Sequence, residues 1–303
     1  MSVGGAGGCG ATGSIGPNMF GEDFYRSDIC YIGMERREES GSADVAFGRS
    51  VHLQVMNVIS FVATVAVNGL AGSTTLLGGK LSSEVSDLYP TLITPAGFTF
   101  SIWGIIYALL LVFIVYQALP RNRDRLFLRQ ISFLFALSGV LNIFWLFLWH
   151  YEFISFSVVL MLGLAVTLIA IYLRLNVGRA SVPLRERVLV HVPFSVYLGW
   201  ITVATIANVA VALTAAGWDG GGIQHADWAV LVVAVAVLIA VIAVVTRKDV
   251  AYSLVIVWAL VGIMSKQIEN QTIVFTAEVG IAIILVAIAA VAAASRLRRQ
   301  VSG

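Results

Sequence analysis

Charged side chains are scarce in this 303-residue chain. Asp, Glu, Lys and Arg make up 12% of it, whereas apolar residues make up 59%. Ordinary soluble domains carry about 25% charged residues, so this composition excludes that class. The charges lie in short loops between apolar runs of about 15 to 23 residues, close to the length that crosses a bilayer core. We therefore predict an all-α, polytopic membrane helix bundle.

The sequence also lacks the motifs of several enzyme classes. It has no phosphate-binding glycine loop, no His and Glu spacing of a metalloprotease and no serine elbow. An ATPase or a metalloprotease therefore has no residues to support it. The four histidines lie at predicted span ends or in loops: His52, His150, His191 and His225. We predict no catalytic residue, no metal ligand and no nucleic-acid partner, and no acid, base or metal constellation argues for an enzyme.

Cysteine is nearly absent. Cys9 and Cys30 both lie in the segment 1–53, which is glycine-rich at its start and charged toward its end. Such a segment cannot bury enough apolar area to fold, and it has no apolar centre of a signal peptide. We predict a disordered cytoplasmic arm over 1–53 without a disulfide framework. The alternative is upstream sequence that is not translated, because Met34 and Met56 could also serve as starts.

Long apolar runs dominate the rest of the chain and predict eight spans. The first is polar for a span and the seventh is short. They are Val55–Leu77, Gly97–Leu119, Ile131–Tyr151, Phe153–Leu175, Val192–Leu213, Trp228–Val245, Val250–Met264 and Ile273–Ala294. After the arm, the predicted organisation is a five-helix membrane domain over 54–214, three additional transmembrane helices over 226–295 and a basic cytoplasmic tail over 296–303.

Basic residues alternate between loops. The loops after spans two, four and six, with the tail, hold thirteen Lys and Arg, whereas the alternate loops hold only Lys80 and Lys266. Basic residues near span ends stay in the cytoplasm. The pattern predicts an even number of spans with both termini cytoplasmic. As a separate expectation, the membrane is the plasma membrane of a prokaryote.

Two ionisable residues are candidates for ion coupling. Glu278 lies about two turns into span eight, and Lys266 lies at the outer end of span seven. Charges inside a membrane are costly and often functional. Either the two residues pair, or Glu278 takes up protons in a transport path, or its carboxylate faces a watery vestibule. A retinal Schiff base on Lys266 is disfavoured because span three has no acidic counter-ion.

Tryptophans and asparagines recur at helical intervals on three spans. Asn142, Trp145 and Trp149 share one face of span three, since intervals of three and seven return to the same side of a helix. Trp200 and Asn208 share a face of span five, and Trp103 and Tyr107 are four residues apart in span two. An unpaired amide is penalised at membrane depth, so these faces are predicted to point into the bundle.

Two interpretations of these residues stay open. In one, the asparagines join helices and the indoles anchor at the membrane interface, which suits Trp149 and Trp228 near span ends. In the other, the side chains line a pocket. Trp145 and Trp200 lie several residues in from the ends and favour the lining.

These residues resemble the tryptophan-rich sensory protein and translocator protein family (TspO/MBR). Its second helix has the form P-P-x-W-x-F-x-x-x-W-x-x-L-Y, and Pro95, Phe98, Phe100, Trp103 and Tyr107 look like the counterpart. Its third helix carries L-N-x-x-W with a further aromatic pair, matched by Leu141, Asn142, Trp145 and Trp149. Its fifth carries P-Y, a Trp and A-x-x-L-N, similar to Pro193, Phe194, Trp200, Ala204 and Asn208. The likeness covers roughly 55–213.

The resemblance implies a five-helix bundle with a pocket that opens toward the first loop and binds porphyrins or other hydrophobic ligands, in sensory, transport or porphyrin-degrading roles. Phe98 stands where the family has Trp, and Ala96 stands where it has a second Pro. Spans six to eight have no counterpart in the five-helix members, so the chain resembles a longer, eight-span branch.

The sequence therefore predicts a membrane protein that binds a flat hydrophobic ligand, with a porphyrin or haem-like tetrapyrrole as the candidate. Its aromatic-lined pocket would have a sensory or transport-regulating role. The predicted lining is Phe98, Trp103, Tyr107, Asn142, Trp145, Trp200 and Asn208. The alternative is a secondary transporter with a coupling site around Glu278. The expected partners are the lipid bilayer and the ligand, and small residues near the C-terminus would permit a homodimer.

Overall fold

The structure is a computed structural model that describes residues 51–72 and 74–301. Over this part of the chain the regular elements are helices, with no β-strand. Among the described residues, six helices are long and apolar enough to cross a membrane: Val51–Gly72, Gly97–Ala118, Ile154–Arg174, Leu184–Ala215, His225–Arg247 and Gln271–Leu297. The prediction of an all-α, polytopic membrane helix bundle is confirmed.

Each predicted span falls on one apolar helix. After the first helix these are η1 (Gly97–Ser101) with α3 (Ile102–Ala118), α5 (Leu134–His150), α6 (Ile154–Arg174), α8 (Val192–Ala215), α9 (His225–Arg247), α10 (Val250–Lys266) and α11 (Gln271–Val301). Both α5 and α10 have 17 residues and rise only about 25 Å, against about 30 Å for a bilayer core. Eight complete crossings therefore stay a prediction.

Several ends differ from the predicted ones. The first helix ends at Gly72 rather than at Leu77, because the chain turns there into the first loop, which carries α2 (Ser82–Asp87). Span three is interrupted: α4 (Leu126–Ile131) stops at Ser132, whose φ of 51° breaks the helix before α5. α11 stays helical through the basic residues after Ala294. Short turns complete the elements: η2 (Pro120–Asn122), α7 (Leu184–Glu186) and the π turn η3 (Arg187–His191).

The predicted arm over 1–53, with Cys9 and Cys30, lies outside the described residues except for its last three. Those three, residues 51–53, form the first turn of the Val51–Gly72 helix.

The polar residues of the first helix face the bundle. Gln54 and Gln117 of α3 are both buried and bond reciprocally, each side-chain amide nitrogen donating to the other residue's backbone oxygen at 2.5 and 3.2 Å. Asn68 donates through Nδ2 to Oδ1 of Asn142 on α5 at 2.6 Å. These bonds explain why a membrane helix tolerates so many polar side chains.

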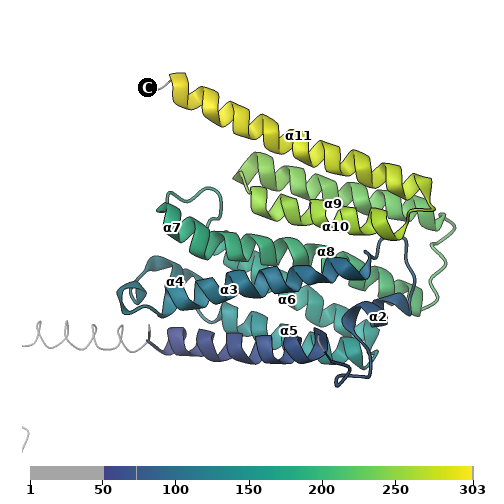
Figure 1. Cartoon of the computed structure of the whole chain (residues 1–303), viewed down its shortest axis with the longest axis horizontal. Helices are drawn as coiled ribbons and strands as arrows, with labels where there is room; N and C mark the ends of the chain where they lie inside the picture. Colours follow the sequence, from purple (N-terminus) through teal and green to yellow (C-terminus); the bar gives the residue numbers. More distant parts are fainter. Residues whose placement is uncertain (1–50, 73, 302–303) are drawn as a thin grey trace, which may run out of the picture. The chain divides into compact units, whose positions relative to one another are not determined.

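The helices form two groups joined by α10. Within the first group α5 packs on α6, and α3 and α6 pack on α8; within the second, α9, α10 and α11 pack on one another (Figure 1). α10 also packs on α8 and η1. A Cβ added at Gly199 of α8 would lie 3.0 Å from the Tyr252 carbonyl oxygen, and one at Gly262 of α10 would lie 2.0 Å from Thr99 Oγ1. Glycine at these positions allows the close approach.

A buried acidic residue fixes the start of α10. Asp249 caps the helix by accepting from the backbone N–H of Tyr252 at 3.1 Å. Its Oδ2 also accepts from the hydroxyls of Tyr172 on α6, at 2.8 Å, and Ser195 on α8, at 2.7 Å. The turn between α9 and α10 is therefore bonded to two helices of the first group.

Candidate functional site

Four tryptophans converge in the first helix group. Trp103 of α3 is the centre of the cluster: its ring centroid lies 6.4 Å from that of Trp145 on α5 and 6.3 Å from that of Trp200 on α8. Trp149 stacks on Trp145 at 5.8 Å, with 24° between the planes. Aromatic pairs at these separations attract one another beyond their burial of area. Three helices thus meet through their indoles, as the spacing predicted.

The cluster surrounds a small cavity of about 30 Å³. A buried site needs roughly 10–15 Å³ for each water, so this space holds only a few solvent molecules and is far below the roughly 300–1,000 Å³ of ligand pockets. Its lining comes from the first loop, η1, α3, α5 and α8: Ser86, Pro95, Phe100, Trp103, Trp145, Trp149, Trp200, Val203, Ala204, Ala207 and Asn208. The aromatic cavity is too small in this structure for a ligand of ordinary size.

The two asparagines bond between helices. Asn208 of α8 accepts through Oδ1 from the indole N–H of Trp145 at 3.0 Å and donates through Nδ2 to Ser157 Oγ of α6 at 2.9 Å. Asn142 is fully buried and bonded to Asn68 of the first helix. Asn208 therefore bonds α8 to α5 and α6 and also lines the cavity. Asn142 does not line the cavity and bonds α5 to the first helix.

Several buried donors beside the cavity lack a hydrogen-bond partner among the described residues. They include Nε1 of Trp200, a residue that lines the cavity, the hydroxyl of Tyr107, which stacks on Trp103 at 5.6 Å, and Nδ2 of Asn142. Leaving a buried polar group unpaired costs about 1–3 kcal/mol. Unpaired donors in an otherwise apolar wall would suit a ligand that carries an acceptor group.

The first loop covers the cavity from the side of α5. The indole N–H of Trp149 donates to the Ser82 backbone oxygen at 3.1 Å. Because Nδ1 of His150 donates to the Leu146 carbonyl, its Nε2 accepts from the Ser82 hydroxyl at 3.2 Å. Gly78 has a φ of 62°, and a Cβ there would lie 2.1 Å from the His150 oxygen. The loop and the end of α5 therefore fit closely.

An ion pair extends this contact. Lys80 Nζ lies 2.8 Å from Glu152 Oε1. The hydrogen bond to this carboxylate raises the pKa of Lys80, so the ammonium keeps its charge further into the alkaline range.

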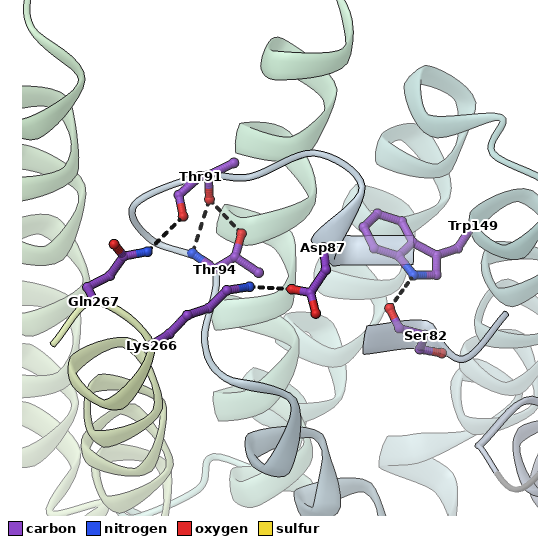
Figure 2. A network of polar contacts seen from close by, with 7 residues as sticks. All are labelled: Ser82, Asp87, Thr91, Thr94, Trp149, Lys266 and Gln267. Carbon is purple, nitrogen blue, oxygen red and sulfur yellow. Dashed lines mark hydrogen bonds and ion pairs between the residues drawn. The ribbon is translucent and has the colours of Figure 1, made fainter. Parts of the chain in front are cut away.

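The far side of the same loop is held by α10. Lys266 forms an ion pair with Asp87 of α2, and Gln267 Nε2 donates to the Thr91 backbone oxygen at 3.2 Å (Figure 2). Below these contacts, the Ala96 N–H donates to the Gly262 oxygen at 3.0 Å, and the Trp258 indole donates to the Thr99 oxygen at 3.0 Å. The cover of the aromatic cavity is therefore attached to both helix groups.

The structure places the predicted lining residues in three different surroundings. Trp103, Trp145, Trp200 and Asn208 line the cavity. Tyr107 and Asn142 lie directly behind that wall. Phe98 lies outside it: its side chain is 49% exposed and contacts the edge of Trp258 on α10 at 5.6 Å.

The two predicted ion-coupling residues are not brought together. Lys266 pairs with Asp87 rather than with Glu278, and Glu278 is exposed on α11. No contact in the structure favours a coupling site around them.

Sequence reasoning missed several wall residues. The position of Trp149 near a span end favours an interface anchor, yet the residue is 4% exposed and lines the cavity. Its helical position, four residues after Trp145 on the same face, was the available signal. Ser86 and Pro95 come from the first loop, where no periodicity could indicate which side chains point inward.

A bundle of apolar helices with aromatic side chains gathered between them and a loop across one end is the architecture of a polytopic helical membrane protein. A family model described as "TSPO-like protein" matches residues 54–291. The chain belongs to this family. The match runs past the motifs that end at Leu213 and continues through α9, α10 and most of α11, so the additional helices fall within it. No curated protein and no solved structure gives a significant match.

Proposed function

We propose that the aromatic cavity is the binding site of a flat hydrophobic ligand with acceptor groups, a porphyrin or related tetrapyrrole. The observation that carries the proposal is the convergence of Trp103, Trp145 and Trp200 from three helices around one space. Indole faces offer offset stacking to a large flat ring system. The unpaired Nε1 of Trp200 supplies a donor for a carboxylate or carbonyl of the ligand.

Binding requires the cavity to open, since about 30 Å³ cannot hold such a ligand. The movable part is the first loop with Ser86 and Pro95, which hydrogen bonds and two ion pairs hold in place beside the buried side chains of Val85 and Ile93. A ligand that binds only the open form shifts the population of the loop, and this shift would give the protein a sensory or transport-regulating output. In this proposal the loop faces outward and both termini are cytoplasmic, in a prokaryotic plasma membrane.

The test is a titration of the purified protein with protoporphyrin, followed by quenching of tryptophan fluorescence. We expect saturable quenching, and Trp200→Phe, which keeps a ring but removes the Nε1 donor, should raise the Kd about 2- to 12-fold, since a hydrogen bond contributes about 0.5–1.5 kcal/mol. Trp218→Phe removes an indole that does not line this cavity and is the matched control. Absence of saturation, or equal Kd values for the wild type and both variants, would contradict the proposal.

A further inference from the structure

A second and larger cavity lies between α8 and α9. Its volume is about 1,010 Å³, compared with about 30 Å³ for the aromatic cavity. α8 and α9 each pack on α10, and the space between them is closed at one end by the Pro90–Ile93 part of the first loop and by Gln267. Here it is called the α8–α9 cavity.

The depth of the α8–α9 cavity corresponds to one bilayer leaflet. Its wall on α8 runs from Thr205 to Thr214, and its wall on α9 runs from His225 to Val235. At 1.5 Å per residue these walls are about 14–15 Å long, which is half of the roughly 30 Å hydrocarbon core. The α8 wall ends at Thr214 and the α9 wall begins at His225, and these two ends lie together on the side of the first loop.

The polarity of the cavity changes along this length. Its deep part is bounded by aliphatic side chains such as Ile206, Val209 and Val235. The Thr205 hydroxyl donates to the Ile201 carbonyl of its own helix at 2.6 Å, so its proton is not available to a ligand. The deep part therefore recognises only an apolar chain.

The end beside the loops is aromatic and polar. Trp218 and Trp228 lie there with ring centroids 5.3 Å apart, and His225, Gln267 and Thr91 lie with them. Tryptophan gathers at the level of lipid headgroups because its ring is apolar and its N–H is polar. This end of the cavity suits the glycerol and headgroup region of a lipid.

The cavity is also reachable from the bilayer. Leu231 is 52% exposed and Val235 is 45% exposed, although both line it. Protein interiors do not keep empty spaces of this size, and the apolar molecules that surround a membrane protein are lipids. We propose that the α8–α9 cavity is a lipid-binding site that takes an acyl chain of one bilayer phospholipid, with the headgroup beside His225 and Gln267.

The site contacts the cover of the aromatic cavity. Leu92 and Ile93 form part of its wall, and Pro95, two residues further on, lines the aromatic cavity. Gln267, at the polar end, holds the Thr91 oxygen (Figure 2). A bound chain supports the Pro90–Ile93 segment from below. The lipid site itself does not depend on the ligand proposed for the aromatic cavity.

The experiment compares two phenylalanine substitutions after reconstitution in phosphatidylcholine vesicles. Ala210→Phe fills the cavity from α8, whereas Ala234→Phe adds the same side chain to an exposed position of α9 outside the cavity. After extraction into detergent, native mass spectrometry counts the retained phospholipids. We expect one tightly held phosphatidylcholine on the wild type and on Ala234→Phe, and an occupancy at least about fivefold lower on Ala210→Phe. Equal occupancy in all three proteins, or retention of none by the wild type, would overturn the proposal.

A second measurement detects the lipid on the wild-type protein and uses substitutions only as a control. The wild type is loaded from vesicles of phosphatidylcholine brominated on its acyl chains and then transferred to unbrominated detergent. Bound lipid should keep quenching the Trp218 and Trp228 fluorescence after the surrounding lipid is removed, and Trp218→Phe with Trp228→Phe should remove the residual quenching. Full recovery of wild-type fluorescence on transfer would refute a retained lipid. Loss of the retained phosphatidylcholine on addition of protoporphyrin, counted by native mass spectrometry, would assign the cavity to a flat ligand instead.

Discussion

The aromatic cavity and the α8–α9 cavity are lined by different faces of α8 and by different residues of the first loop, and they are built differently. The first has four indoles and an unpaired donor but a volume of only about 30 Å³, and the second has mostly aliphatic walls and about 1,010 Å³. Specific chemistry and available space are thus found in different places. The difference indicates that the aromatic cavity must open for a ligand, whereas the α8–α9 cavity is already large enough to be filled from the bilayer.

The three helices beyond the five-helix domain give both cavities a common support. α10 packs on α8, holds η1 through Gly262 and holds the loop through Lys266 and Gln267. Changes to α10 should therefore separate the two cavities experimentally. Three substitutions test this support, in order of decreasing expected effect.

The largest effect is expected at the start of α10. Asp249→Ala leaves the buried hydroxyls of Tyr172 and Ser195 without their acceptor and removes the helix cap. Hydrogen bonds to charged groups contribute about 1.5–3 kcal/mol each, so we expect the loss of all three to lower the unfolding free energy by at least roughly 4 kcal/mol. Thermal unfolding in detergent, followed by circular dichroism, measures it. Ser265→Ala, whose exposed hydroxyl bonds only to its own helix, is the control. An unchanged melting temperature would show that α10 does not depend on this carboxylate.

The second effect is expected where α10 meets η1. In Gly262→Val the new Cβ overlaps Thr99, a fully buried residue, and approaches Pro95 Cβ at 3.0 Å. Overpacking costs about 1–3 kcal/mol, and here it should displace the wall of the aromatic cavity more than that of the α8–α9 cavity. We expect weaker porphyrin quenching with lipid retention unchanged. Gly104→Ala adds a Cβ that meets nothing within 4 Å and should behave as the wild type. Equal losses at both cavities would remove the distinction between them.

The smallest effect is expected at the loop. Lys266→Gln removes the ion pair with Asp87, whose side chain is 57% exposed, so the change in stability should stay below about 1 kcal/mol. The loop should open more often, and porphyrin association measured by stopped-flow quenching should be faster. High salt should speed the wild type toward the variant, because it screens exposed charges. A variant that binds at the wild-type rate would show that this pair does not restrain the loop.

The helical class, the positions of the eight apolar helices and the inward faces of Trp103, Trp145, Trp200 and Asn208 could be predicted from the sequence. These features depend on local properties, namely the length of an apolar run and the 100° rotation per residue, which the chain carries in its own order. Ser132 shows the limit even there, since no local signal placed the break between α4 and α5.

The size of each cavity, the partner of Lys266 and the burial of Asp249 were decided only by the tertiary structure. A volume depends on how side chains from distant helices interdigitate, and Trp149, Ser86 and Pro95 enter the wall from segments that are far apart in sequence. Lys266 and Asp87 form an ion pair although they are 179 positions apart in the sequence. Glycine is needed at 262 because Thr99 of η1 lies where a Cβ would be. The sequence determined which surfaces are apolar or aromatic, and the packing of α10 against α8 and the first loop determined which of them enclose a site.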